Sequence, residues 1–527
     1  MGIILDPTSE SFRESLNSQI YVDKSMLIMC TNNVINTMQK YVCVSRPRRF
    51  GKSVAANMLC AYYGSTDSAD MFETLKIAQT KDYKKYLNKF HVIHINMIDY
   101  INKYQNTSDS LDYLQKRLLH ELKSAFGAVD CFDWNDLVYV LSDIYSAVNT
   151  KFVFIIDEWD CVFRRRKDDI EGHRIYLDFL RNLLKDKPYV ALAYMTGILP
   201  IKKYGEHSAL NMFTEISITQ AREYAEYTGF TEDEVKALCD KYRMDYNEIT
   251  HWYNGYKVNG IDIYNPKSVV EAMLSQQIGN YWTQTETYEA LKIYIQADVA
   301  GLHGKIERLI AGDHLDIDIT SFQNDMTSFS GSDDVLTLLI HLGYLTYDGR
   351  VGADRISKCH IPNQEVQDEF IRCIKYEGNW AGVTDAIQKS DKLLTDTING
   401  NERAVENALR QLHFESTSLL EYNDENSLAC LINLAYYAAK KYYTVVRELE
   451  TGEGFADVVF IPYKATDKPA IIMELKYNNS ADTAIKQIKE KRYHGALSDH
   501  LDNLLMVGIG YDRKSKEHTC KIERFTI

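Results

Sequence analysis

Short apolar runs alternate with longer amphipathic stretches from Tyr41 to about Ile218. Many of the apolar residues are β-branched, which suits buried strands, and the amphipathic stretches suit helices. The expected strands are 41–45, 91–97, 152–157, 190–197 and 213–218. Strands separated by helical segments favour a mostly parallel sheet with helices on both faces. The pattern therefore predicts an α/β domain in this part of the chain.

Beyond Thr219 the pattern becomes helical and rich in aromatic residues. Thr231 stands three residues before Glu234, which is the spacing of a capping box at the start of a helix. Residues 286–400 are expected to be mainly helical, with a two-stranded piece inside 343–362. This middle region is predicted to form a winged-helix-like lid or linker.

A different order of elements follows residue 400. The pattern predicts a helix, three strands, a second helix and a last strand. These elements are expected at 425–441, 442–449, 455–462, 470–477, 481–493 and 503–511. The last part of the chain is therefore predicted to be a second α/β unit.

The composition agrees with several folded domains. The chain has 527 residues, and roughly 100–200 residues per domain suggests about three. We predict domains at 1–285, 286–400 and 401–527. A hydrophobic share of 45%, with 8 Pro and 26 Gly, indicates large buried cores. The net charge of −14 argues against a histone-like bulk cation, so any nucleic-acid groove must be local.

The cysteines and the apolar segments indicate a reducing, cytoplasmic setting. The 10 Cys are scattered singly, without a CxxC pair, so neither disulfides nor a structural zinc is expected. The first apolar run is followed at once by Asp6 and Glu10, which does not suit a signal peptide. No segment approaches the roughly 18 apolar residues that span a bilayer, so no membrane partner is expected.

The first candidate site is a phosphate-binding loop that ends in Gly51, Lys52 and Ser53. These three residue types alone are weak evidence, because they occur by chance in roughly a quarter of chains this long. Here the expected strand 41–45 runs into the loop and an amphipathic helix leaves it. That arrangement directs the helix start at a phosphate, Lys52 at the β and γ phosphates, and the Ser53 hydroxyl at Mg²⁺.

The entrance of this loop is unusual, because Arg46 holds the position where such loops usually carry their first glycine. Arginine lacks the freedom of glycine to adopt positive φ, so we expect the loop to open by a different backbone path. Arg46, Arg48 and Arg49 also place positive charge beside the phosphates. A role for these arginines in nucleotide binding is a hypothesis.

Two acids about a hundred residues further on fit a Walker B site. The expected strand 152–157 ends in Asp157, and Glu158 follows it. Asp157 would hold the Mg²⁺ shell, and Glu158 would polarise the attacking water. Thr196 lies at the end of the next expected strand, where it could sense the γ phosphate or simply begin a turn. Paired with the loop, the two acids predict nucleotide hydrolysis.

The second candidate site lies on the expected strands 455–462 and 470–477. Glu474 and Lys476 are two residues apart on one strand, so their side chains share a face. Asp457 on the preceding strand and Glu474 could bind Mg²⁺ together with the carbonyl of Leu475. Lys476 could then position or activate a water for attack on a phosphodiester. Glu448 is a further candidate acid.

An ordered set of motifs resembles one known family over essentially the whole chain. The motifs are YVDKSMLI (21–28), RPRRFGKS (46–53), IIDEWD (155–160), MTGIL (195–199), WYNGY (252–256), YNPKSV (264–269), GYLT (343–346) and IPNQEV (361–366). The set is similar to AAA-ATPase-like proteins of bacteria and archaea that carry a C-terminal PD-(D/E)xK nuclease-type domain. The resemblance implies a P-loop NTPase sheet covered by helices and a C-terminal restriction-endonuclease-like domain.

The resemblance also implies site residues. In that family RPRRFGKS is the usual loop, so Arg48, Arg49 and Phe50 join Gly51, Lys52 and Ser53 as expected nucleotide-binding residues. It adds Glu425 as a further metal-site acid, with Gln487 and Tyr493 as accessory residues. Trp159 departs from the pattern, since a tyrosine is more usual there. Phe455 and Ala456 depart as well, since a basic residue is common there, which weakens the prediction of phosphate binding at that point.

Other motifs favour structural roles. Asp23 and Lys24 are expected to be structural. The aromatic residues of the WYNGY motif favour packing around a turn over stacking on a base. The arginines 164–166 could approach a phosphate or a neighbouring subunit, but a charge run favours a solvated face.

These sites predict a Mg²⁺-dependent ATPase whose nucleotide cycle controls a nuclease domain acting on DNA. ATP and Mg²⁺ are the expected cofactors, with Mn²⁺ as a substitute at the nuclease site, and a homo-oligomer is left open. One alternative is a nucleotide-switched scaffold whose inactive nuclease fold holds nucleic acid or protein without cutting. Another is an ATPase that acts on a protein.

Overall fold

The computed structural model describes residues 2–201, 210–282, 287–297, 299–322, 329–350, 356–375, 380–415, 425–451, 454–463, 466–491, 497 and 500–525. Two compact units divide the chain. The first contains Met1–Tyr281 and Asp316–Pro362, and the second contains Trp282–Leu315 and Asn363–Ile527. The chain therefore passes from one unit to the other three times.

A parallel sheet forms the centre of the first unit. Its strands are β1 (Tyr41–Ser45), β2 (His91–Asn96), β3 (Phe152–Asp157), β4 (Val190–Gly197) and β5 (Thr214–Ile216). Their order across the sheet is β2-β3-β4-β1-β5, and each pair of neighbours is parallel. The α/β fold expected from the sequence is confirmed, and β4 lies between the strands that carry the two predicted nucleotide motifs.

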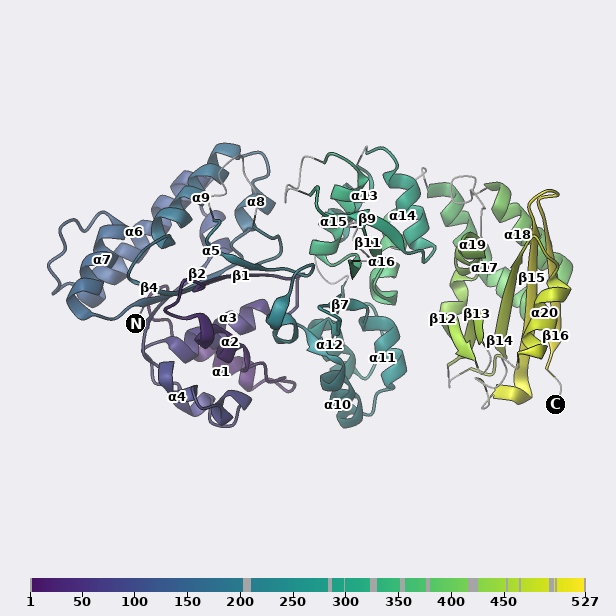
Figure 1. The fold of residues 1–527 in the computed structure, drawn as a ribbon, viewed down its shortest axis with the longest axis horizontal. Coiled ribbons are helices and arrows are strands. Elements are labelled where there is room, and N and C mark those ends of the chain that lie inside the picture. Colours follow the sequence, from purple (N-terminus) through teal and green to yellow (C-terminus); the bar gives the residue numbers. More distant parts are fainter. Residues whose placement is uncertain are drawn as a thin grey trace. The chain divides into compact units, whose positions relative to one another are not determined.

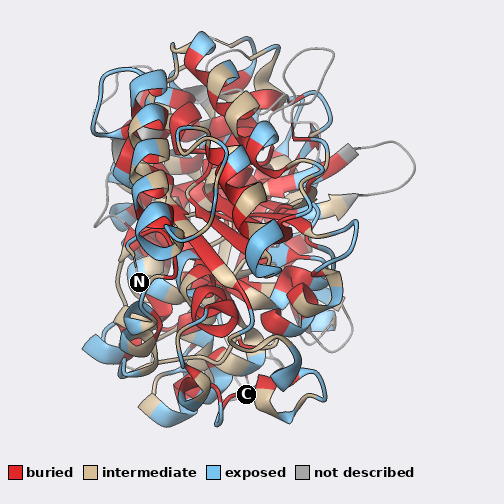
Figure 2. Cartoon of the chain, turned by 90° about the vertical axis from the view of Figure 1, so that its left-hand side faces the viewer, coloured by how far each residue is buried: buried red, intermediate tan, exposed pale blue. Residues whose placement is uncertain are grey.

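Helices cover both faces of this sheet, above and below the strands in Figure 1. They are α1 (Glu10–Leu16), α2 (Leu27–Val34), α3 (Lys52–Tyr63), α4 (Tyr83–Tyr86), α5 (Met97–Ile101), α6 (Thr107–Phe126), α7 (Leu137–Val148), α8 (Cys161–Arg165) and α9 (Ile170–Leu184). Phe154 and Ile156 of β3 join a core with α6, α7 and α9, whereas Val153 and Ile155 join a core with α2 and α3. The strands are accordingly red, or buried, in Figure 2.

A small antiparallel sheet follows β5. It contains β6 (Phe230–Thr231), β7 (Tyr256–Val258) and β8 (Ile261–Tyr264) in the order β6-β8-β7. The helices beside it are α10 (Glu232–Tyr242), α11 (Tyr246–Tyr253) and α12 (Pro266–Ser275). The capping box expected from Thr231 and Glu234 begins α10. This sheet and its helices share one hydrophobic core.

The two-stranded piece expected inside 343–362 is present as β10 (Thr346–Arg350) and β11 (Ile356–His360). A third strand, β9 (Leu315–Asp318), completes a sheet of order β10-β11-β9. The sequence analysis missed β9, which has only four residues. Helix α15 (Ser332–Leu342) precedes β10.

The second unit combines helices with a mixed sheet. The helices are α13 (Thr287–Ile295), α14 (Leu302–Ile310), α16 (Gln364–Ile374), α17 (Ala381–Ile398), α18 (Glu402–Glu415), α19 (Glu425–Ala435) and α20 (Ala481–Glu490). The strands are β12 (Tyr443–Thr451), β13 (Gly454–Pro462), β14 (Ala470–Tyr477), β15 (Leu504–Asp512) and β16 (Glu517–Arg524). They follow the order β12 to β16, and β14 and β15 form the parallel pair.

The predicted helix and strand order of the last part is confirmed, with β16 as an addition. Strand β16 carries only two buried residues, His518 and Cys520, so it has no apolar run for a sequence pattern to detect. The domain limits expected at 285 and 400 stay predictions. No helix in the described part of the chain is both long and apolar enough to cross a membrane.

Candidate functional site

Strand β1 leads directly into the predicted phosphate loop. Gly51 caps α3 at a φ of 81°, a conformation that favours glycine. Ser53 is exposed in the first turn of α3, where backbone N–H groups have no partner within the helix. A Cβ atom at Gly51 would meet nothing within 4 Å. The loop therefore combines open space with the helix start that suits a phosphate group.

Lys52 lies inside this loop. Its Nζ donates to the carbonyl oxygens of Arg46, at 3.0 Å, and Pro47, at 2.8 Å. Burial lowers the pKa of Lys52, while the negative charges of Glu158 and Asp157 oppose that shift. The ammonium group and the two acids therefore lie close enough to interact.

Arg46 is buried, whereas its charge had suggested a position beside the phosphates. Its side chain is 1% exposed, and Nη1 donates to the carbonyl oxygen of Ser45 at 3.1 Å. Burial lowers the pKa of Arg46 to about 10. Positive φ occurs in the loop at Arg49 and Gly51, so the chain leaves β1 without the left-handed turn of a first glycine. The side chain of Arg46 thus contacts the base of the loop, below the surface.

The next loop residues contact a neighbouring segment of the first unit. Arg49 Nη1 donates to the carbonyl oxygen of Tyr281 at 2.7 Å. Phe50 is buried, and its ring meets that of Tyr256 edge-on, with centroids 5.2 Å apart. Tyr256 in turn donates to the carbonyl oxygen of Gly343 at 2.8 Å. The packing role expected for the WYNGY aromatics is confirmed for Tyr256, and its contact with Phe50 was not foreseen.

A cavity of about 180 Å³ adjoins Gly51. Its lining is largely apolar and comes from the segment before α2, from the loop and from α3; it includes Ile20, Val22, Phe50, Val54, Ala55, Met58 and Phe230. Lys24 lies at this cavity and donates to Glu234 Oε2 at 2.6 Å. Apolar walls beside a phosphate loop suit the flat face of a nucleoside base.

The predicted Walker B acids lie at the carboxyl end of β3. Thr196, on the adjacent strand β4, donates to Asp157 Oδ1, and the backbone N–H of Glu158 donates to the same oxygen at 3.0 Å. Asp157 is 4% exposed and Thr196 is fully buried. The structure therefore brings Asp157, Glu158 and Thr196 together beside the strand that carries the loop.

Of the arginines 164–166 after these acids, Arg165 is exposed as expected, whereas Arg164 and Arg166 are partly buried, which corrects the expectation of a solvated face for these two. The side chain of Arg164 is only 8% exposed and pairs with both Glu158 and Asp160. Arg166 donates to the carbonyl oxygens of Ile101 and Tyr104. Asp160 caps α8 and Arg164 lies on it, and their i to i+4 spacing was the signal that could have revealed the pairing.

The second candidate site lies where the antiparallel strands β13 and β14 stop pairing with each other. The last paired residues are Val458 and Met473. Asp457 and Glu474 are the next residues on the two strands. Asp457 Oδ2 accepts the backbone N–H of Leu475 at 2.7 Å. The two predicted acids therefore lie together where β13 and β14 separate, and this place is called the fork from here on.

Glu474 is almost fully buried in this fork, at 1% exposed. Its Oε1 accepts from Lys476 Nζ at 2.9 Å and from Gln487 on α20. Its Oε2 is buried without a hydrogen-bond partner in the described part of the chain. Burial, together with the charge of Asp457, raises the pKa of Glu474 to about 7. A buried carboxylate oxygen without a donor, close to a second carboxylate, is the environment that a divalent cation stabilises.

The other residues proposed for this fork have different outcomes. Glu448 is exposed and stands opposite Asp457, between the pairs Arg447–Val458 and Leu449–Ala456. Glu425 begins α19, but its side chain and the whole of Tyr493 lie outside the described residues. Phe455, where a basic residue was expected, is 58% exposed.

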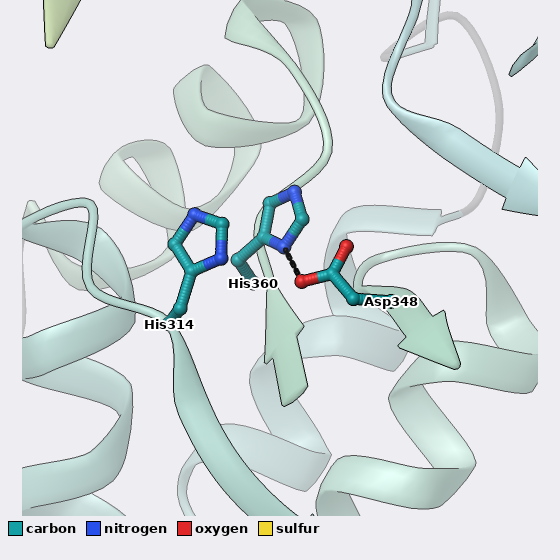
Figure 3. A group of neighbouring side chains, drawn as sticks. All are labelled: His314, Asp348 and His360. Atoms are coloured by element: carbon teal, nitrogen blue, oxygen red, sulfur yellow. Dashed lines mark ion pairs between the residues drawn. The ribbon is translucent and has the colours of Figure 1, made fainter. Parts of the chain in front are cut away.

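A further pair of ionisable side chains lies on β10 and β11 of the first unit. Asp348 Oδ2 on β10 and His360 Nδ1 on β11 are 3.2 Å apart, as Figure 3 shows. His314, also drawn there, belongs to the second unit.

Comparisons with known proteins agree with this geometry. Residues 10–205 match a family described as predicted AAA-ATPase, and residues 423–520 match the PD-(D/E)XK nuclease superfamily. The chain thus contains a predicted AAA-ATPase domain and, toward its C-terminus, a domain of the PD-(D/E)XK nuclease superfamily. The resemblance inferred from the sequence motifs is confirmed.

One curated relative is an uncharacterized protein in the vnfD 5' region of Azotobacter chroococcum mcd 1. It is 25% identical over 334 residues, which cover 62% of this chain and 61% of the relative. The chain thus spans less than two thirds of the relative's length. Its name supplies no activity.

Solved structures similar to the chain include proteins named ORC. A Drosophila ORC bound to DNA is 11% identical, covers 70% of this chain and 91% of its own, and has a TM-score of 0.25. The Aeropyrum pernix ORC2 protein is 10% identical, covers 68% and 96%, and has a TM-score of 0.28. At these scores the likeness supports no argument about function.

Proposed function

We propose that this protein is a Mg²⁺-dependent ATPase whose nucleotide cycle controls a metal-dependent nuclease domain acting on DNA. The observation that carries the ATPase half is the order of strands β1, β4 and β3 in the sheet. It brings the phosphate loop, Thr196 and the acids Asp157 and Glu158 to the carboxyl ends of neighbouring parallel strands. Open α/β sheets bind their ligands outside that edge.

In the nucleotide site, Gly51 and the start of α3 bind the phosphates through backbone N–H groups, and Lys52 pairs with the β and γ phosphates. Ser53 and Asp157 hold Mg²⁺, which when bound neutralises charge on the phosphates. Glu158 orients the attacking water. Thr196 senses the γ phosphate through its hydrogen bond to Asp157.

The base and the outer phosphates have their own proposed contacts. The apolar cavity beside Gly51 accepts the base, with Phe50 on its wall. Arg48 and Arg49 contribute positive charge at the mouth of the loop, where both are half-buried.

In the nuclease site, Asp457, Glu474 and the carbonyl of Leu475 hold Mg²⁺ or Mn²⁺, with Glu425 as a further acid. An ion held by these groups would supply Lewis-acid polarisation of the scissile phosphodiester. Lys476, whose side chain is 15% exposed, orients the attacking water. Among the residues that the structure describes, none is hydrogen-bonded to the buried Glu474 Oε2, and this observation supports a metal at this fork.

The test is a cleavage matrix with the full chain. Linear, supercoiled and single-stranded DNA and RNA are incubated with Mg²⁺ or Mn²⁺, with and without ATP. We expect DNA cleavage that depends on ATP and is lost in Asp457→Ala and Glu474→Ala, and ATP turnover that is lost in Lys52→Ala. Glu490→Ala, at an exposed position on α20, is the matched control and should cleave normally.

A different experimental result would contradict each of the two proposed activities. Cleavage that survives both acid substitutions contradicts the nuclease assignment, and ATP turnover unaffected by Lys52→Ala contradicts the ATPase assignment. Metal and DNA binding without any cleaved product would favour the nucleotide-switched scaffold.

A further inference from the structure

The turn between β15 and β16 is strongly basic. The two strands pair as far as Asp512 and Glu517, and three of the four residues between these acids carry a positive charge. They are Arg513, Lys514 and Lys516, and all three are exposed. The chain as a whole has a net charge of −14. The turn is therefore a local concentration of positive charge on an acidic protein, which is the feature that a nucleic-acid contact requires here.

The three basic side chains of this turn form no salt bridge within the part of the chain that the structure describes, although an acid stands on each side of them. Asp512 Oδ1 instead accepts the backbone N–H groups of Lys514, at 3.0 Å, and Ser515, at 2.8 Å. The exposed Lys441 of the same unit, in contrast, pairs with Asp391 at 2.6 Å. The positive charges of the turn are thus available to a partner outside the chain.

The turn lies at the same edge of the sheet as the proposed nuclease site. Strands β14 and β15 are parallel, and Lys476 stands opposite Gly510. Arg513 follows three residues after Gly510, which corresponds to about 10 Å along an extended strand. Its backbone N–H donates to Asn478 Oδ1 at 3.0 Å, and Asn478 is two residues beyond Lys476. The basic turn is therefore attached to the strand that carries the proposed catalytic lysine.

Duplex DNA is the polyanion that suits this arrangement best. It carries one negative charge per about 1.7 Å of its axis, twice the density of a single strand. Arginine and lysine bind its phosphates without reading the base sequence. On one strand, a distance of about 10 Å corresponds to about three phosphates. A duplex whose scissile phosphate lies at Lys476 would therefore bring flanking phosphates to the turn.

We propose that the β15–β16 turn binds the backbone of duplex DNA beside the cleavage point, through Arg513, Lys514 and Lys516. The turn positions the substrate and takes no part in the chemical step. This inference rests on the proposed nuclease function, and it assigns the substrate contact to an element that carries none of the residues of the metal site.

The test measures how the affinity for DNA depends on salt. The full chain and its variants Arg513→Gln, Lys514→Gln and Lys516→Gln are titrated into a fluorescein-labelled duplex without divalent metal, and anisotropy is read at several KCl concentrations. Each lost phosphate contact should lower the slope of log affinity against log salt by about 0.9, and the affinity at 0.1 M salt by about five- to tenfold. In Mg²⁺, KM for the duplex should rise while kcat for cleavage is unchanged.

Lys441→Gln is the matched control. It also removes one exposed positive charge, and its side chain is 58% exposed. Lys441 precedes β12, and β12 runs in the same direction as β14 because each is antiparallel to β13. Lys441 therefore lies at the opposite edge of the sheet, and its substitution should leave the salt slope and KM unchanged. Lys514→Arg keeps the charge of the turn and should bind like the parent.

The outcomes separate this inference from the proposed function. If the parent binds and cleaves the duplex while the three turn variants keep its salt slope and KM, the turn proposal is wrong and the nuclease proposal stands. If the parent neither binds nor cleaves the duplex, both are wrong. An equal loss of affinity in Lys441→Gln, or a loss seen with single-stranded RNA alone, would also contradict the assignment of the turn to duplex DNA.

Discussion

At the scale of single residues, burial changes what a side chain can do. Glu474 illustrates this, since its position in the fork of β13 and β14 raises its pKa to about 7. Lys52 shows the opposite direction, because burial lowers its pKa. An acid that is hard to ionise and a base that is hard to protonate both become easier to charge when an oppositely charged ligand arrives.

Metal binding at the fork should therefore depend on pH. The raised pKa of Glu474 means that a proton occupies the carboxyl below about pH 7, and that proton must leave before the oxygens can bind a cation. We expect the apparent affinity for Mg²⁺ to rise between pH 6 and pH 8 and then level off. Isothermal titration calorimetry with MgCl₂ at several pH values measures this.

Glu474→Gln is the control for that titration, because an amide does not ionise; the residual binding of Mg²⁺ should not change over the same pH range.

The raised pKa of Glu474 also makes the free energy of unfolding depend on pH when no metal is bound. The folded state holds the proton more tightly than an unfolded chain, so the contribution of this group to stability decreases as pH rises toward 7. An affinity that is flat from pH 6 to pH 8 in the parent protein would refute the assignment of Glu474 as a ligand.

At the scale of elements, the phosphate loop is packed against the small antiparallel sheet. Phe50 contacts Tyr256 of β7, and the backbone N–H of Gly229 donates to the Phe50 carbonyl oxygen at 2.9 Å. Gly229 has a φ of 91°, and a Cβ there would lie 2.2 Å from Ile263 Cγ2. The close approach that only glycine permits is thus what brings this sheet against the loop.

The Tyr256 hydroxyl is the link from this packing to the end of α15. Tyr256→Phe keeps the ring against Phe50 but removes the donor to the Gly343 carbonyl oxygen. We expect a loss of about 1–2 kcal/mol in the free energy of unfolding, because both groups are buried. Urea unfolding followed by tryptophan fluorescence measures it.

Tyr139→Phe serves as the reference for that measurement, since Tyr139 is 59% exposed and its substitution should change stability by less than about 0.5 kcal/mol. Equal stability of the Tyr256→Phe and Tyr139→Phe proteins would mean that the bond to Gly343 contributes nothing.

The strands and the nucleotide motifs were predictable because their signals are local. The buried strands of the first sheet are largely continuous apolar runs. Asp157 and Glu158 come directly after such a run, and Gly51, Lys52 and Ser53 follow another after the short segment 46–50. The spacing of Glu474 and Lys476 likewise placed them on one face. A strand is harder to predict when few of its residues are apolar and buried, and β16 was missed for this reason.

The contacts that the sequence did not reveal join distant segments. The ring contact of Phe50 with Tyr256 and the bond of Asp160 to Leu199 each depend on how the elements pack. The burial of Arg46 is a similar case. Its charge suggested the phosphates, but its side chain ends beside the carbonyl oxygen of Ser45.

At the scale of the whole molecule, the two compact units are interleaved in sequence. The second unit takes Trp282–Leu315 from the middle of the chain and combines it with Asn363–Ile527. Within that unit Arg447 on β12 donates to the Gly312 carbonyl oxygen at 2.9 Å, and Thr397 on α17 is hydrogen-bonded to Tyr436 at 2.7 Å. The sheet that carries the nuclease site is therefore supported by helices that precede residue 400.

A fragment comparison tests this support. A fragment of residues 401–527 lacks α17, whose contacts include Thr397 with Tyr436 and Ser390 with the backbone N–H of Ala438. We expect it to melt at a lower temperature than a fragment of residues 380–527, because buried groups on α19 and the turn after it lose their partners. Circular dichroism during heating measures both. Identical melting curves would show that α17 does not stabilise this sheet.

The three passages of the chain between the units limit how such a protein can be rearranged by recombination. A single crossover between two related genes combines segments of different parents in at least one unit, since the units alternate as 1–281, 282–315, 316–362 and 363–527. The ATPase-like region 10–205 and the nuclease-like region 423–520 each lie within one segment, but a crossover between them leaves Trp282–Leu315 or Asp316–Pro362 packed against a segment from the other parent. The backbone path therefore favours inheritance of the matching segments together.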